Sequence, residues 1–480
     1  MALITVDTDS TRAAKPLHGV GQAPFSGLNF RMVKYLKDAG IPFSRLHDVA
    51  WYYGGSVFAD IPAIFPDFSR DPYDPTAYSF GFTDKFIEAL VENDVEPFFR
   101  LGVTIENFHA VKAFHIFPPA DFDKWARVCE MVVRHYTEGW NNGYRFNIRY
   151  WEIWNEADNE REPEANPMWQ GTKEQFYDLY ETASKHLKKC FPHLKIGGYA
   201  SCGFYAVLNT DAPIEANVGS RLSYFVEFFD GFLEHVKRTG SPFDFFSWHS
   251  YDGIAHNLIY ADYAKRRLTG AGCGDVEIFC DEWNLELDQK GTMRHASAVA
   301  GMMLAFTEAP LDGAMFYDAG YGISTYAGLF NPLTAKPFPA YYAFVAYNEL
   351  YKRKTLYKVT VTAGGSGSGC GSGSGYGSGS GSESGSGPCS GSESGESPAG
   401  PEPVAGIYAA AGGPPDDMVL VVANTTGSSV PVEVRSSGGL LSVTEKTDII
   451  CENSEGRMVP SAEPWCVQPF GVSIFRLRRG

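Results

Sequence analysis

The chain has 480 residues, with 40 Lys and Arg against 57 Asp and Glu, and a formal net charge of −17. At roughly 100–200 residues per domain, this length corresponds to two or three domains, although a single barrel can take up most of it. A hydrophobic fraction of 44% supplies a large packed core. So acidic a chain repels phosphate backbones and anionic lipids, which argues against nucleic acids and membrane surfaces as partners.

The N-terminal sequence, the hydropathy and the cysteines together indicate the cellular compartment. No apolar run approaches the roughly 18–20 residues of a spanning helix, and residues 1–7 have neither a basic region nor a long apolar run of a signal peptide. The nine cysteines are scattered and form no CxxC pair, so free thiols are expected. We therefore expect a cytoplasmic protein.

Residues 15–350 alternate short apolar runs with longer helical patterns, as repeated β–α units around a parallel sheet do. The expected strands cover residues 17–20, 43–46, 97–101, 150–154, 195–198, 243–248, 277–280 and 314–317. The expected helices cover residues 29–39, 83–92, 121–136, 173–189, 222–238, 260–268 and 295–308. Eight strands in this length favour a (β/α)8 barrel. The alternative, a doubly wound open sheet, would bring a glycine-rich phosphate turn, which His18-Gly19-Val20-Gly21 matches poorly.

Residues 351–480 consist of short β-type runs separated by Gly, Pro, Ser and Asn. This pattern predicts a small antiparallel β-sandwich, to which a strand from residues 1–14 could be added. Residues 363–403 form a Gly/Ser tract that buries too little apolar surface to offset its ordering entropy. We expect it to be a disordered loop within the sandwich, and an interdomain linker is the alternative.

The motif YWEIWNEA places Glu156 at the carboxyl end of the fourth expected strand, where barrel enzymes place their reacting groups. By the period of two, Glu152, Trp154 and Glu156 share a face if the strand is regular. A carboxylate as deep as Glu152 needs a partner, and Arg45 or Arg100 could provide it. We interpret Glu152 as structural and Glu156 as functional.

A second apolar strand ends in the same way, in the motif VEIFCDEWN with Glu282. Two facing carboxylates are what cleavage of a glycosidic bond needs, one to protonate the leaving oxygen and one to attack or to activate water. At about 5.5 Å and an effective dielectric near 20 they repel by about 3 kcal/mol, or roughly two pKa units. That repulsion is enough to keep one of them protonated while the other stays charged.

These motifs resemble the clan A retaining glycoside hydrolases, and more closely glycoside hydrolase family 39, which contains β-xylosidases and α-L-iduronidases. The resemblance spans nearly the whole chain outside the Gly/Ser tract. It rests on the closing sandwich and on Arg45-Leu46-His47, Trp154-Asn155-Glu156, Trp248-His249-Ser250-Tyr251 and Asp281-Glu282-Trp283-Asn284.

The resemblance implies that Glu156 is the general acid/base and Glu282 the nucleophile of a retaining mechanism. It implies sugar-binding roles for a further set of residues, with Arg45 and Glu152 in support. The residues of that set are His47, Asn155, His249, Tyr251 and Trp283. Two alternatives stay open: Arg45 only neutralises barrel carboxylates, and His249 is only a hydrogen-bonded barrel histidine.

The eighth strand departs from the family pattern, because residues 313–320 contain no tryptophan. Asp318 is the expected substitute for the acidic residue there, and Tyr317 or Tyr321 for the stacking face. The aromatic loop at residues 51–55 is a candidate wall of the leaving-group subsite. This departure does not affect the expected retaining mechanism, but it leaves open which sugar the enzyme binds.

We expect a retaining exo-glycosidase, most similar to β-xylosidases, that acts on a small oligosaccharide or glycoside without a cofactor. Arabinosides, glucosides, galactosides and iduronides are alternatives under the same mechanism. A non-catalytic carbohydrate-binding barrel is the alternative of another class. A metal-dependent hydrolase lacks support, because His18, His47 and His249 lie on separate strands with no carboxylate cluster expected beside them. A homo-oligomer is left open.

Overall fold

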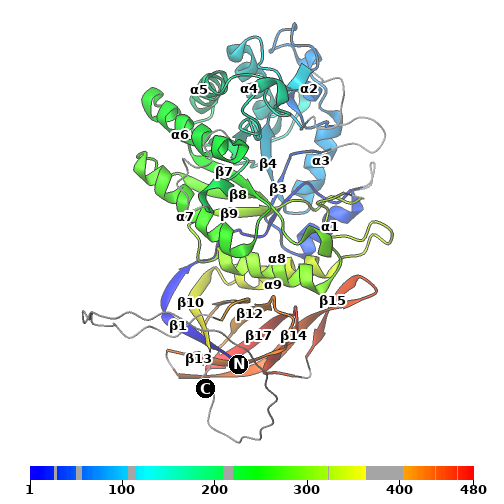
Figure 1. Cartoon of the computed structure of the whole chain (residues 1–480). Helices are drawn as coiled ribbons and strands as arrows, with labels where there is room; N and C mark the ends of the chain where they lie inside the picture. The colour runs from blue at the N-terminus through cyan, green and yellow to red at the C-terminus, as the bar shows by residue number, and fades with distance from the viewer. Residues whose placement is uncertain are drawn as a thin grey trace, which may run out of the picture.

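The computed structural model describes residues 1–25, 30–49, 57–105, 114–208, 220–322, 324–363, 404–437, 439–461 and 463–479. The chain forms a barrel of strands ringed by helices and, below it in Figure 1, a large β-sheet that contains both ends of the chain. Among the described residues, no helix is long and apolar enough to cross a membrane.

Eight parallel strands pair in chain order and close a barrel. They are β2 (Gly19–Gly21), β3 (Phe43–Arg45), β4 (Glu96–Leu101), β5 (Tyr150–Ile153), β6 (Lys195–Ser201), β7 (Phe245–Ser250), β8 (Glu277–Trp283) and β9 (Gly313–Phe316). The predicted (β/α)8 barrel is confirmed. Each predicted barrel strand overlaps an observed one. The barrel strands are continuous apolar runs because both of their faces are buried.

The helices surround the barrel. They are α1 (Lys34–Asp38), α2 (Ile61–Ile64), α3 (Gly81–Glu92), α4 (Phe122–Thr137), α5 (Lys173–Cys190), α6 (Arg221–Thr239), α7 (Ile254–Gly270), α8 (Met293–Phe306) and α9 (Pro339–Tyr351). Local sequence sets where several of them begin: Thr172 and Gln175 form a capping box at the start of α5, and the side chain of Asp121 caps α4.

Helix α9 is absent from the sequence-based prediction. Its sequence, PAYYAFVAYNELY, is apolar on nearly every face, so it lacks the amphipathic period that marks a surface helix. In the structure α8 and α9 lie between the barrel and the sheet (Figure 1), so apolar side chains are buried on both sides of them.

An aromatic layer closes the amino-terminal end of the barrel. Phe98 is fully buried, and its ring lies 5.2 Å from the rings of both Tyr150 and Phe245 and 5.4 Å from that of Phe279. These side chains come from β4, β5, β7 and β8 and fill the barrel interior, as the inward-facing layers of such barrels do. The opposite, carboxyl end is left for polar side chains.

The remaining strands form one nine-stranded sheet in the order β15-β14-β17-β12-β11-β10-β1-β13-β16. Their bounds are β1 (Ala2–Ala13), β10 (Thr355–Ala363), β11 (Ile407–Gly412), β12 (Met418–Asn424), β13 (Val430–Ser436), β14 (Gly439–Glu452), β15 (Glu455–Pro460), β16 (Cys466–Val467) and β17 (Val472–Arg479). The antiparallel strands of the predicted β-sandwich are confirmed, with two differences from that prediction. The sheet curls so that β13 also pairs with β14, and the β1–β13 pair is parallel.

Strand β12 is buried on both faces and joins the two parts of the molecule. Val419 and Val421 belong to the large core shared with the barrel, whereas Leu420 and Val422 face a second core inside the curled sheet. This explains why the run MVLVVA shows no polar alternation. The Gly/Ser tract lies outside the described residues, apart from Ala363 at the end of β10.

Candidate active site

A cavity of about 330 Å³ opens at the carboxyl end of the barrel strands. It is lined by His47, Asp48, Ile105, Glu156, Asn159, Cys202, Tyr205, Arg221, Phe225, Tyr251, Glu282, Tyr317 and Tyr326. Six of the sequence-predicted site residues are not in this lining: Arg45, Glu152, Asn155, His249, Trp283 and Asp318. The predicted wall at residues 51–55 lies outside the described residues.

Glu156 reaches the cavity through a turn that the sequence pattern did not predict. Strand β5 ends at Ile153, and Trp154 and Glu156 both have positive φ, 72° and 45°. The indole of Trp154 therefore turns outward and donates to the carbonyl of Met168 at 2.9 Å. The prediction that Trp154 shares a face with Glu152 and Glu156 is wrong, because the strand is not regular there.

Glu282 is delivered by a strand with irregular pairing. The pairing of β8 with β9 changes register between Cys280 and Trp283. Its pairing with β7 also changes register nearby, as happens at a β-bulge. Both Asp281 and Glu282 consequently contact Arg45, whereas Trp283 points outward and packs edge-on against Phe306 and Phe316. The predicted sugar-binding role of Trp283 is wrong, since its side chain is fully buried in the core.

The structure brings the two predicted carboxyl groups together at His249. Its Nδ1 lies 2.8 Å from Oε1 of Glu156, and its Nε2 lies 3.6 Å from Oε2 of Glu282. One atom from each of the three residues lies within 4.8 Å of the other two. The expectation that no carboxylates accompany His249 is therefore wrong, because residues far apart in sequence meet at the barrel axis.

These three side chains are also types that can ligate a metal ion. The guanidinium of Arg45, 3.1 Å from Glu282, adds a positive charge that opposes a cation at this point. The prediction that no metal is used stays a prediction.

The protonation equilibria of the pair are tightly coupled. Burial raises the pKa of Glu282, and the charge of Glu156 adds to this. Burial also acts to raise the pKa of Glu156, but hydrogen bonds from His249 and Asn159 outweigh it, so the pKa of Glu156 is lowered. Burial disfavours a charge on His249, yet the two carboxylates raise its pKa. Without a sugar, Glu156 is thus the more readily ionised of the two acids.

Arg45 is the centre of a buried polar cluster below the cavity. It is fully buried and donates to Glu152 at 2.8 Å, to Glu282 at 3.1 Å and to Oδ1 of Asn155 at 2.6 Å. Its Nε also lies 2.9 Å from Asp281. Of the two partners proposed for Glu152, the structure selects Arg45, because Arg100 pairs with Asp60 instead.

The oxygens of Glu282 are held from two sides. Tyr251 donates its hydroxyl proton to Oε1, and Arg45 donates to Oε2 at 3.1 Å. Burial and the neighbouring charge of Glu282 raise the pKa of Tyr251, so the phenol stays protonated and able to donate. This pair of donors orients the carboxylate and favours its charged form.

Opposite the carboxyl pair, the structure adds a residue that the sequence analysis missed. Asp48 lines the cavity, accepts from the Tyr317 hydroxyl at 2.7 Å and lies 3.0 Å from Nε2 of His47. Burial raises the pKa of Asp48 to about 6. Its position directly after the motif Arg45-Leu46-His47 was a signal that could have pointed to it.

Asp318, predicted as a substrate ligand, lies beside this group without lining the cavity. It is 3% exposed and accepts from the backbone N–H of Gly320 at 2.8 Å. Burial raises its pKa to about 7. Among the described residues, its hydrogen-bond partner is a backbone N–H, and its side chain does not line the cavity.

Asn159 and Arg221 form a support that the sequence analysis did not predict. Asn159 donates to Oε2 of Glu156 at 2.8 Å, and Arg221 holds the side chain of Asn159 at 2.8 Å. Arg221 comes from the start of α6, which no local motif links to Glu156.

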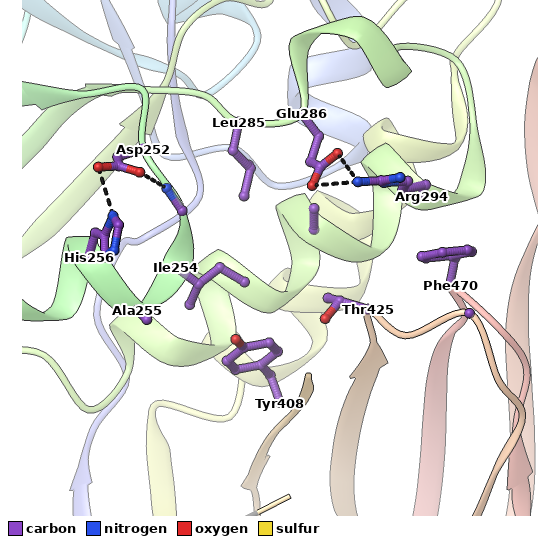
Figure 2. Close-up of a pocket in the computed structure, with 13 residues that line it drawn as sticks. Asp252, Ile254, Ala255, His256, Leu285, Glu286, Arg294, Tyr408, Thr425 and Phe470 are labelled. Carbon is purple, nitrogen blue, oxygen red and sulfur yellow. Dashed lines mark hydrogen bonds and ion pairs between the residues drawn. The ribbon is translucent and has the colours of Figure 1, made fainter. Parts of the chain in front are cut away.

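A second cavity, of about 510 Å³, lies at the junction of barrel and sheet (Figure 2). The loops after β7 and β8, together with α7 and α8, form one side of it, and Tyr408, Thr425 and Phe470 of the sheet form the other. Its charged groups are paired with each other: Asp252 with His256 at 2.9 Å and Glu286 with Arg294 at 2.9 Å. It shares no lining residue with the candidate active site.

Comparison with known proteins adds independent information on the family. Residues 57–266 match the model for glycosyl hydrolases family 39. A β-xylosidase of Geobacillus stearothermophilus is 25% identical over 224 residues, which are 45% of this chain and 39% of that protein. A β-xylosidase of Caldicellulosiruptor saccharolyticus is 25% identical over 187 residues, 36% of this chain and 31% of that protein. The chain thus matches less than half the length of these relatives.

Solved structures share the fold over the whole chain. A glucosidase from Croceicoccus marinus superposes with a TM-score of 0.68 at 17% identity, covering 100% of this chain and 99% of that one. A monomeric β-xylosidase from Caulobacter crescentus gives a TM-score of 0.60 at 13% identity, covering 99% of each chain. At such identities the likeness establishes the fold alone.

The family recognised from the motifs around Glu156 and His249 is the one that the family model matches. Residues 57–266, which include Glu156 and His249, are therefore similar to glycosyl hydrolases family 39.

Proposed function

We propose that the protein is a retaining exo-glycosidase that releases a terminal sugar from a small glycoside, with a β-xyloside as the leading substrate. The observation that carries this proposal is the approach of Glu156 and Glu282 to within 4.8 Å of each other around His249. Retaining enzymes hold their carboxyl groups about 5–5.5 Å apart, whereas inverting enzymes need about 6.5–9.5 Å to admit a water molecule.

In the first step, an oxygen of Glu282 forms a bond to the anomeric carbon while the bond from that carbon to the leaving oxygen breaks. Glu156 gives its proton to the leaving oxygen. In the second step, Glu156 takes a proton from water, the water oxygen bonds to the anomeric carbon, and the ester to Glu282 breaks. These two roles come from the family resemblance, and the placement of both carboxyl groups in one cavity supports them.

This cycle needs a proton on Glu156 and none on Glu282, the reverse of the preference in the sugar-free site. The two arrangements differ only in the position of one proton. His249 contacts both carboxyl groups and is the route by which that proton transfers. A sugar that displaces the His249 contact from Glu156 raises the pKa of Glu156, so we propose that binding itself sets the active protonation state.

The sugar is proposed from the names of the relatives and from the pocket. Both curated relatives are named β-xylosidase, and a solved neighbour is named glucosidase, so a β-glucoside is the first alternative. We propose that His47, Asn155, His249, Tyr251 and Tyr317 bind the sugar, with Asp318 behind them. The division into a catalytic unit of residues 15–350 and a sheet unit of residues 351–480, and a cytoplasmic location, belong to the same proposal.

The test uses a panel of nitrophenyl glycosides and two variants of the whole chain. With a nitrophenyl β-xyloside, Glu282→Ala abolishes turnover because no ester can form. Glu156→Ala slows the second step, and added azide restores turnover and yields a β-glycosyl azide, because a small anion needs no general base. Parental activity in both variants, or product of inverted configuration, contradicts the assignment. Sugar binding with no hydrolysis of any glycoside would instead support a carbohydrate-binding barrel.

A further inference from the structure

Asp281 lies beneath the candidate active site and has no role in the proposed chemistry. Its side chain is fully buried, next to Glu282 in sequence. Arg45 Nε lies 2.9 Å from its Oδ2, and Nε2 of His249 lies 3.6 Å from its Oδ1. The carboxyl group of Glu152 is its third polar neighbour.

The hydrogen bonds of this carboxyl group are unlike those of an ionised aspartate. Among the described donors, none gives a well-directed hydrogen bond to either oxygen of Asp281. The Nε hydrogen of Arg45 is directed to Glu152, at 2.8 Å. Oδ2 of Asp281 lies 2.9 Å from the same nitrogen, so the carboxyl groups of Asp281 and Glu152 adjoin there. Two adjoining carboxyl groups can hydrogen bond to each other only when one of them carries a proton.

A count of charges leads to the same result. Four carboxyl groups meet around one guanidinium and one imidazole: Glu152, Glu156, Asp281 and Glu282 around Arg45 and His249. An unbalanced buried charge is costly, so at most two of the four acids are ionised even when the imidazole is charged. Two protons therefore stay on the acids.

Glu152 is the acid most suited to ionise. It accepts from Arg45 at 2.8 Å and from the hydroxyl of Ser247 at 2.5 Å. Although burial opposes its charge, these donors and Asp281 lower its pKa. Burial and the charge of Glu152 raise the pKa of Asp281 well above its usual value.

We propose that Asp281 is a neutral positioning acid, whose proton is donated to Glu152 and whose lack of charge leaves Glu282 free to ionise. This inference rests on the proposed function, because it assigns what Asp281 does for the nucleophile. An ionised Asp281 would add a third negative charge around Arg45 and hold a proton on Glu282, which could then not attack. The second of the two protons belongs to Glu156 in the active state.

Thermal stability tests the protonation without reference to activity. Between its unfolded pKa of about 3.9 and its raised folded pKa, a buried acid releases its proton on unfolding. Its contribution to wild-type stability therefore falls as the pH rises through that range. Asparagine is isosteric and has no proton to release. We expect Asp281→Asn to raise the Tm, by more at pH 8 than at pH 5. A lower Tm for Asp281→Asn, with the largest loss near neutral pH, would mean an ionised Asp281 paired with Arg45 and would overturn the proposal.

Asp158 provides a matched control. It is another fully buried acid close to the cavity, but its oxygens accept from the Ser201 hydroxyl at 2.7 Å and from the Cys202 N–H at 3.1 Å. Asp158→Asn introduces an amide N–H₂ where donors already point, so we expect it to lower the Tm.

Kinetics on the nitrophenyl β-xyloside test the positioning role. Asp281→Ala removes the donor to Glu152 and is expected to lower kcat about tenfold or more, whereas Asp281→Asn keeps a donor and restores kcat to within about threefold of wild type. Equal losses in both variants would overturn the role. If wild type hydrolyses no glycoside, the proposed function fails, while the Tm comparison still decides the protonation of Asp281.

Discussion

At the scale of single residues, the candidate site depends on which donor faces which carboxyl oxygen. Glu282 receives hydrogen bonds from Tyr251 and Arg45, and Glu156 receives them from His249 and Asn159. These contacts, more than the distance between the acids, set which of them is ionised at a given pH. Each contact can therefore be examined through the pH dependence of catalysis.

Tyr251→Phe removes the hydroxyl that donates to Glu282. A hydrogen bond to a charged group contributes about 1.5–3 kcal/mol, so we expect kcat/KM to fall roughly 10- to 100-fold. Because the carboxylate loses a donor, the pKa of Glu282 rises. Glu282 is the less readily ionised acid of the sugar-free enzyme, so the alkaline limb of the kcat/KM profile moves to higher pH. The control variant is Tyr326→Phe. Tyr326 also lines the cavity but makes no described hydrogen bond to Glu282, so this variant should leave that limb in place. An unmoved alkaline limb in Tyr251→Phe would contradict this reading.

His249→Asn tests the other acid. Against the effect of burial, the hydrogen bond and charge of His249 lower the pKa of Glu156. Without the imidazole the pKa of Glu156 rises. Glu156 is the more readily ionised acid of the sugar-free enzyme, so the acidic limb of kcat/KM is expected to move to higher pH. Asn159→Ala should move it in the same direction by less, since the amide carries no charge. A limb that moves to lower pH in both variants would exclude Glu156 as the acid.

At the scale of elements, the barrel could be predicted from sequence because its strands are apolar runs and its helices alternate regularly with them. The curl of the C-terminal sheet and the presence of helix α9 could not be predicted from the sequence. Their residues are buried on both faces, so the periodicity that reveals amphipathic elements is absent.

Catalytic residues at the ends of strands could be predicted from the sequence. The directions of side chains at irregular backbone positions could not. Glu156, Glu282 and Arg45 were identified from motifs and meet in the structure. The outward turns of Trp154 and Trp283 follow from positive φ and a register shift, which depend on tertiary pairing. Asn159 and Arg221 reach Glu156 from a loop and a distant helix, and a single sequence carries no record of that contact.

The aromatic layer at the closed end of the barrel gives a test at this scale. Phe98→Ala leaves a cavity among rings contributed by neighbouring strands and is expected to cost about 3–5 kcal/mol of unfolding free energy. Phe98→Leu, which fills part of the space, should cost less. Urea denaturation followed by fluorescence measures both. A loss below about 1 kcal/mol for Phe98→Ala would mean that the layer does not close the barrel.

At the scale of the whole molecule, barrel and sheet share one hydrophobic core through α8, α9 and β12. The two parts are therefore expected to unfold together, with a single calorimetric transition. Two well-separated transitions would show that the shared core contributes little to stability.

The Gly/Ser tract permits a complementary experiment. The chain leaves β10 at Ala363 and returns at Val404, whose N–H donates to Val361 at 3.4 Å, so the two ends are close. Replacing residues 364–403 by four Gly/Ser residues shortens the loop about tenfold, which by loop-closure entropy stabilises the fold by about 2 kcal/mol. We expect an equal or higher Tm. A clear fall in Tm would show that the tract contributes packed structure.

Strand β1 has a consequence for how the chain is made. It occupies an interior position of the sheet, between β10 and β13. Roughly 340 residues separate β1 from β10, and at about 5–20 residues per second a ribosome needs roughly 20–70 s to add them. During that interval β1 lacks the strands with which it pairs, and its apolar residues Ile4 and Val6 are open to holdase chaperones.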